Sequence, residues 1–155
     1  MLSLMIACNT PRHATSPANS EVMPEDSPTI LFLNYEIARD TENSAYSARL
    51  INKVAVNGTI KPDLAQAKLA EAGDLELQVL DKNETLLHIL YIPDPLEKVV
   101  EFVNDRGELQ KNEISLDIAE FSVRIQLEPG ATTALLKRLS GPDTESILLV
   151  NTKLQ

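Results

Sequence analysis

The feature that most constrains the fold of this chain is an alternation of apolar and polar residues with a period of two. It is clearest over 121–127, where Phe121, Val123, Ile125 and Leu127 alternate with polar or charged residues. A β-strand sends successive side chains to opposite faces, so this period predicts a strand with one face in a core.

The same period recurs along most of the chain, with turn residues between the alternating stretches. We predict strands over 30–38, 48–56, 74–80, 86–92, 109–116, 121–127, 132–139 and 145–153. A spacing of about 8–12 residues between turn signals is typical of antiparallel sandwiches. In rhythm alone the chain resembles immunoglobulin-like bacterial sandwich domains. The resemblance implies an all-β, antiparallel immunoglobulin-like sandwich of about eight or nine short strands.

Two of these strands have less regular patterns. In 48–56 we expect one apolar face, interrupted by Asn52, and one basic face. The apolar face consists of Leu50, Val54 and Val56, and the basic face of Arg49 and Lys53. The stretch 86–92 is apolar on both faces, which favours a central strand covered on both sides, or a strand whose outer face meets a loop or a partner.

Two segments depart from the strand period. Asp63 is a good helix cap, 65–72 are strong helix formers and Gly73 is a helix stop, so 62–73 predicts a short helical crossover or an ordered loop. The stretch 95–104 fits a helical stripe but is rich in β-branched and aromatic residues. A strand is the favoured interpretation there, because 105–107 forms a compact hairpin loop before the next alternating stretch.

Length and charge limit the classes of function. The 155 residues suit one domain, and an apolar fraction of 43% is enough for a core. The net charge of −9 repels phosphate backbones, so we expect no nucleic-acid partner. The chain has no tryptophan and few other aromatic residues, which disfavours stacking platforms for carbohydrates or single-stranded nucleic acids.

The N-terminal stretch ends in the only cysteine of the chain, Cys8, and Met5-Ile6-Ala7-Cys8 resembles the lipobox of bacterial lipoproteins. The resemblance implies that the preceding residues are removed and that Cys8 is acylated, so that lipid chains anchor the protein to a membrane. It divides the chain into a truncated signal at 1–8, a flexible Pro-, Ser- and Asn-rich linker at 9–28 and a sandwich domain at 29–155. In the resemblance to bacterial lipoproteins, Asn9 directly after the cysteine implies that the lipid anchor lies in the outer membrane.

Residues that could carry chemistry are few. Of the two histidines, one lies in the linker, so only His88 could serve as the base of a catalytic triad, and its place within an apolar strand favours a structural role. Two histidines and one cysteine, far apart in the chain, cannot build a zinc site. The acidic turn Asp81-Lys82-Asn83-Glu84 lacks the glycine and the distal glutamate of a calcium loop. We therefore expect no catalytic residues, no metal and no cofactor.

These observations predict a non-catalytic lipoprotein of the bacterial cell envelope that binds or assembles with another envelope protein. The lipid attachment at Cys8 is the one site residue that the sequence assigns. Two alternatives remain open: a small envelope hydrolase that uses two carboxylates, and a structural subunit of a larger envelope complex.

Overall fold

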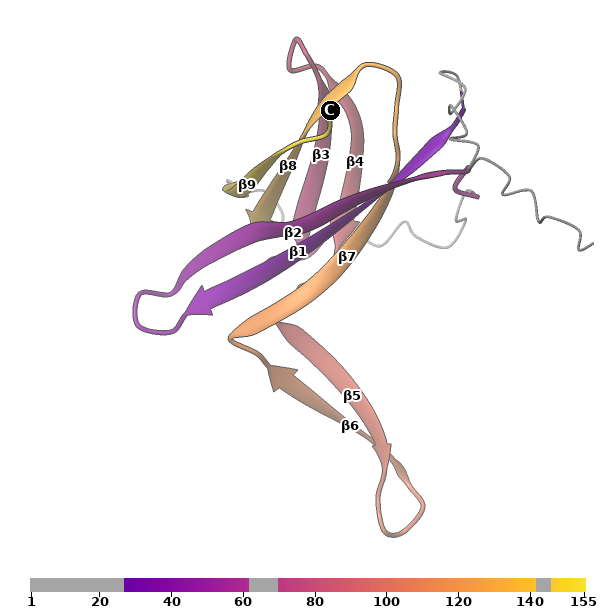
Figure 1. The fold of residues 1–155 in the computed structure, drawn as a ribbon. Coiled ribbons are helices and arrows are strands. Elements are labelled where there is room, and N and C mark those ends of the chain that lie inside the picture. The colour runs from indigo at the N-terminus through magenta and orange to yellow at the C-terminus, as the bar shows by residue number, and fades with distance from the viewer. Residues whose placement is uncertain (1–26, 62–69, 142–145) are drawn as a thin grey trace, which may run out of the picture.

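The computed structural model describes residues 27–61, 70–141 and 146–155, and every regular element in them is a β-strand. The nine strands (Figure 1) are β1 (Thr29–Asp40), β2 (Ala45–Asn57), β3 (Leu75–Asp81), β4 (Leu86–Ile92), β5 (Glu97–Val103), β6 (Leu109–Ser115), β7 (Ile118–Gln126), β8 (Ala131–Leu139) and β9 (Ser146–Lys153). All pairings between them are antiparallel. The all-β, antiparallel prediction is confirmed.

The strands form three sheets. One sheet has the order β2-β1-β7, a second has the order β4-β3-β8-β9, and β5 pairs only with β6. The first two sheets share one core, while the β5–β6 hairpin extends away from them (Figure 1). We call this hairpin, Glu97–Ser115, the ribbon.

The core follows directly from the period of two. In β1 the side chains of Leu31, Leu33, Tyr35 and Ile37 are all buried, as their spacing predicts. The facing sheet contributes alternate residues of β3 and β8, and β7 contributes Ala119, Val123 and Ile125. Closely packed apolar side chains from two facing sheets supply most of the stability of such a fold.

The predicted faces of β2 are wrong beyond its middle. Asn34 pairs with Asn52 and Tyr35 with Leu50, so Ile51 is an extra residue that makes a β-bulge. After one extra residue, every later side chain moves to the opposite face. Val54 is therefore on the outer face, and the side chain of Lys53 donates hydrogen bonds to two carbonyls at the C-terminal end of the chain.

The suggestion that β4 is a central strand is also wrong. β4 is the edge strand of its sheet, paired with β3 alone. Leu90 and Ile92 pack against the core, whereas Leu86, Leu87 and Tyr91 are exposed. The remaining alternative, that the outer face of this strand meets a loop or a partner, stays a prediction.

The predicted helical crossover at 62–73 falls mainly on 62–69, which lie outside the described residues. In the described part, 70–74 form a turn whose Asp74 carboxylate accepts a hydrogen bond from the backbone N–H of Glu71. The described stretches contain no helix that is long and apolar enough to cross a membrane.

The strand interpretation of 95–104 is confirmed, because β5 occupies Glu97–Val103 and pairs along its whole length with β6. The hairpin loop predicted at 105–107 joins the two strands. What the sequence analysis did not anticipate is that this hairpin leaves the sandwich instead of extending one of its sheets (Figure 1).

Candidate functional site

The ribbon is the most exposed ordered element in the described part of the chain. All seven residues of β5 and all seven of β6 are exposed to solvent. Six large apolar side chains are among them: Val99, Val100, Phe102, Val103, Leu109 and Ile114. Exposed apolar side chains concentrated on one element make the ribbon a candidate interaction surface.

The two faces of the ribbon differ in charge. Register and alternation place Lys98, Val100, Phe102, Gln110, Asn112 and Ile114 together on one face, which we call the apolar face. The opposite, charged face carries Glu97, Val99, Glu101, Val103, Leu109, Lys111, Glu113 and Ser115. The apolar face has no carboxylate, although the chain as a whole has a net charge of −9.

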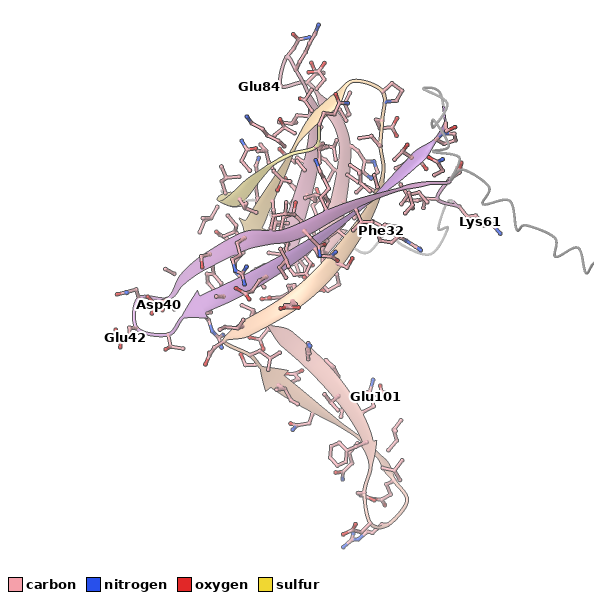
Figure 2. All side chains as sticks on the ribbon, in the orientation of Figure 1. Phe32, Asp40, Glu42, Lys61, Glu84 and Glu101 are labelled. Atoms are coloured by element: carbon pink, nitrogen blue, oxygen red, sulfur yellow. The ribbon has the colours of Figure 1, made fainter. Side chains whose placement is uncertain are left out.

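The charged face neutralises part of its own charge. Glu101 and Lys111 are direct cross-strand partners, and their side chains form an ion pair of 2.8 Å. Glu101 stands midway along the ribbon, from which side chains project on both sides (Figure 2). Such a pair fixes the register of two strands more than it stabilises them, because exposed ion pairs contribute little free energy.

The base of the ribbon is held firmly to the sandwich. Leu96, the residue before β5, is completely buried, and its carbonyl accepts a hydrogen bond of 2.8 Å from the N–H of Leu116. The guanidinium of Arg39, at the end of β1, lies 3.0 Å from the hydroxyl of Ser115 and 3.5 Å from the carboxylate of Glu97. The ribbon therefore projects from the two-sheet sandwich at a defined position.

A buried ion pair supports this base from the other sheet. The guanidinium of Arg138, on β8, lies 2.8 Å from the carboxylate of Asp94, and both side chains are nearly buried. Asp94 also accepts a hydrogen bond from the N–H of Leu96. Arg138 in turn lies 3.9 Å over the ring of Tyr46 from β2, so both sheets contribute to the base.

The tip of the ribbon is polar. The side-chain oxygen of Asn104 accepts hydrogen bonds from the N–H groups of Arg106 and Glu108, at 2.9 and 3.0 Å. Gly107 has a φ of +79°, a conformation that glycine adopts without strain. Asp105, Arg106 and Glu108 place three charges at the tip, which opposes insertion of the tip into hydrocarbon.

A second candidate for a functional site is a shallow hollow on the outer face of the β2-β1-β7 sheet. It is lined by Asn34, Ile51, Asn52, Glu120, Phe121 and Ser122. Glu120 is its single carboxylate and is the cross-strand partner of Glu36. Two adjacent carboxylates are what the hydrolase alternative requires.

The environment of Glu36 does not suit acid catalysis. Arg49 binds its carboxylate in a bidentate manner, at 2.7 and 2.8 Å. The hydrogen bonds from Arg49 lower the pKa of Glu36, whereas a general acid of this kind needs a raised pKa. Glu36 is therefore the ion-pair partner of Arg49 on an open sheet face, with Glu120 beside it on the neighbouring strand.

Of the features that the sequence singled out, His88 and the acidic turn 81–84 lie on the β3–β4 hairpin. Cys8, predicted to carry lipid, lies outside the described residues. His88 is exposed on the edge strand β4, and Asp81 lies at the turn of the same hairpin, two residues after Val79, the cross-strand partner of His88. The Asp81 carboxylate accepts hydrogen bonds of 2.8 Å from the N–H groups of Asn83 and Thr85, so its oxygens organise a turn.

Sequence reasoning identified the ribbon as two strands but did not identify it as a site. One signal was available: β5 reads Glu-Lys-Val-Val-Glu-Phe-Val, with apolar residues on both faces and charges between them. A strand with one face in a core keeps its charges on the other face. The break in alternation at Val99 and Val100 indicated a strand outside the core.

The comparisons with known proteins add no identification. Neither the family models, nor the curated proteins, nor the solved structures contain a match to this chain.

Proposed function

We propose that this protein is a non-catalytic, lipid-anchored module of the bacterial cell envelope that binds another envelope protein through its ribbon. The single observation that supports this function is that all fourteen residues of β5 and β6 are exposed to solvent. An isolated two-stranded hairpin is marginally stable in water, so an apolar ribbon of this kind gains most from a partner that covers it.

The anchor belongs to the same proposal. Acyl chains at Cys8 would hold the protein at the outer membrane, and the Pro- and Ser-rich linker at 9–28 would let the sandwich stand away from the lipid surface. The immunoglobulin-like classification is also proposed. It is supported by the division into facing sheets of three and four strands, the number in a constant-type domain.

Site-specific photocrosslinking in cells tests the recognition step. A photoreactive phenylalanine analogue replaces Phe102 on the ribbon or Ile147 on β9, two positions with similar exposure, 45% and 53%. We expect a discrete adduct with one other protein from position 102 and none from position 147. Equal labelling from both positions, or none from position 102, would contradict the proposal.

The anchor is tested separately by mass spectrometry of the protein recovered from membranes. We expect an N-terminal Cys8 that carries acyl chains, and release of the Cys8→Ser variant from the membrane fraction. An unmodified Met1 terminus on the membrane-bound protein would contradict lipid anchoring and would leave the ribbon proposal standing.

A further inference from the structure

The direction of the backbone groups in the ribbon can be derived from its two ends. The N–H of Leu116 binds the carbonyl of Leu96, and the N–H of Asn104 binds the carbonyl of Glu108. Directly opposed residues of an antiparallel pair alternate between hydrogen-bonded and non-hydrogen-bonded. Even-numbered residues of β5 therefore direct their backbone groups toward β6, and odd-numbered residues direct them outward.

The outward groups form a free edge along β5. Val99, Glu101 and Val103 present their N–H and C=O groups on the side away from β6, whereas the outward N–H of Glu97 already donates a hydrogen bond of 3.2 Å to the carbonyl of Asp94. Within the described chain β5 has no strand neighbour on that side. This is the set of backbone groups that an added strand would use.

This edge lacks two of the usual protections against pairing. The β5–β6 pairing contains no register shift, like the β1–β7 pairing, whereas the other four pairings each contain one. β5 also contains no proline. Bulges and prolines are two of the devices with which proteins keep a foreign strand from adding to an edge, and β5 has neither, so its backbone is open to pairing. Its charged side chains are a third such device, and they restrict which strand can add.

The charges near the edge indicate the chemistry of the occupant. Glu97 pairs with Arg39 and Glu101 pairs with Lys111. In the described residues the ammonium of Lys98 makes no such ion pair, so it is the charge that an acidic residue on an added strand would complement. A lipid surface is disfavoured by the charged tip, and a second copy is disfavoured by the net charge of −9 on each chain.

We propose that β5 accepts a strand of a different protein by β-augmentation along Glu97–Val103, with a carboxylate of that strand near Lys98. β5 is chosen over β6 because four of its seven residues are large and apolar, against two in β6. The inference rests on the proposed function and specifies how the ribbon recognises its partner.

A pair of substitutions at one position tests backbone pairing. Val99→Pro removes an outward N–H and leaves the β5–β6 hydrogen bonds intact, whereas Val99→Thr keeps the N–H and changes the side chain similarly. Each is combined with the photoreactive residue at position 102 in the full-length chain. We expect the adduct yield to fall about tenfold for Val99→Pro, because one buried acceptor on the added strand loses its donor, and to change less than about twofold for Val99→Thr.

Two further measurements complete the design. Hydrogen exchange at the inward N–H groups of Val100 and Phe102 shows whether the ribbon remains folded in the Val99→Pro variant. Lys98→Glu should lower the adduct yield by about tenfold, and Lys98→Gln by less, if a carboxylate faces this position.

The outcomes separate the two proposals. Equal labelling by the Val99→Pro and Val99→Thr variants, with the ribbon intact, would overturn β-augmentation while the ribbon remained the docking element. An adduct made only with a second copy of this chain would overturn the assignment to a different protein. If the photoreactive residue at position 102 gives no adduct in the chain without further substitutions, the proposed function itself is contradicted.

Discussion

β1 and β5 are strands of similar apolar content in opposite surroundings. Both strands are rich in large apolar residues, but Leu33 and Tyr35 in β1 are completely buried, whereas Val99 and Val103 in β5 are among the most exposed apolar residues. β1 lies between β2 and β7 and faces a second sheet, whereas among the described strands β5 has β6 as its one neighbour and no sheet facing it. The comparison teaches that local pattern determines the strand, and topology determines what its apolar side chains contact.

This difference separates stability from recognition. The core residues of β1 lose water on folding, and each contributes about 1.5–3 kcal/mol of burial free energy. The apolar residues of the ribbon remain in water and contribute little until another molecule covers them. The predictions below test this division, beginning with the largest expected effect.

Truncating a core residue should destabilise the protein strongly. We expect Leu33→Ala to lower the free energy of unfolding by about 2–5 kcal/mol, because Leu33 is completely buried between the two sheets. Urea denaturation monitored by circular dichroism measures the change. Val103→Ala on the ribbon is the matched control and should change it by less than about 0.5 kcal/mol; equal effects would contradict the comparison.

Removing one buried hydroxyl should have a smaller effect. The Tyr35 hydroxyl lies 3.0 Å from the Thr152 hydroxyl and connects the two sheets, and the Tyr35 ring stacks on Phe121. Tyr35→Phe keeps the stacking but leaves Thr152 without this partner. We expect a loss of about 1–3 kcal/mol. The double variant Tyr35→Phe, Thr152→Val should recover part of the loss, and no recovery would argue against the hydrogen bond.

Removing the Arg39 contacts at the base of the ribbon should destabilise the ribbon more than the two-sheet sandwich. Arg39 contacts Glu97, Ser115 and Asp117, which begin β5, end β6 and follow it. We expect Arg39→Ala to change global stability by less than about 1 kcal/mol, because these contacts are partly exposed. Hydrogen exchange in β5 and β6 should accelerate while exchange in β3 stays unchanged. Uniform acceleration in both regions would show that ribbon and body unfold together.

The two hairpin tips should differ in their response to acid. Hydrogen bonds from the backbone N–H groups of Thr85 and Asn83 lower the pKa of Asp81 below its ordinary value, and in the ribbon the neutral side chain of Asn104 accepts the equivalent backbone hydrogen bonds. A carboxylate with a lowered folded pKa stabilises the protein above its unfolded pKa, and this contribution is lost as the pH falls through the folded value.

We therefore expect Asp81→Asn to weaken the decrease in stability below about pH 4. The pH dependence of the thermal unfolding temperature between pH 2 and 6 measures this change, with Asn104→Ala as the control at the tip of the ribbon. An unchanged acid response in Asp81→Asn would contradict the turn as described.

The sequence predicted the strands well because their local signal is strong. The period of two located β1, β3 and β7 together with their inward faces, and turn residues located most of the loops. The faces of β2 could not be predicted, because the bulge at Ile51 depends on pairing with β1 and has no local signature. β4 was located correctly, but its suggested central position was wrong, because apolar residues on both faces fit a central strand and an exposed edge equally well.

The candidate site was harder to predict than the fold. The position of the ribbon depends on Leu96, Arg39 and the Arg138–Asp94 ion pair, which come from segments far apart in the chain. No single stretch of sequence contains that arrangement. The prediction of a lipid anchor at Cys8 concerns residues outside the described structure and stays a prediction.

The most direct test of the account is a ribbon variant examined for stability and recognition together. In Val100→Ser, Phe102→Ser, Ile114→Ser, the apolar face becomes polar while the core is untouched. With a photoreactive residue at position 109 in the variant and in the unsubstituted chain, we predict loss of the crosslinked adduct and a change in the free energy of unfolding below about 1 kcal/mol. A large loss of stability, or an adduct that persists unchanged, would contradict the claim that the ribbon serves recognition and not folding.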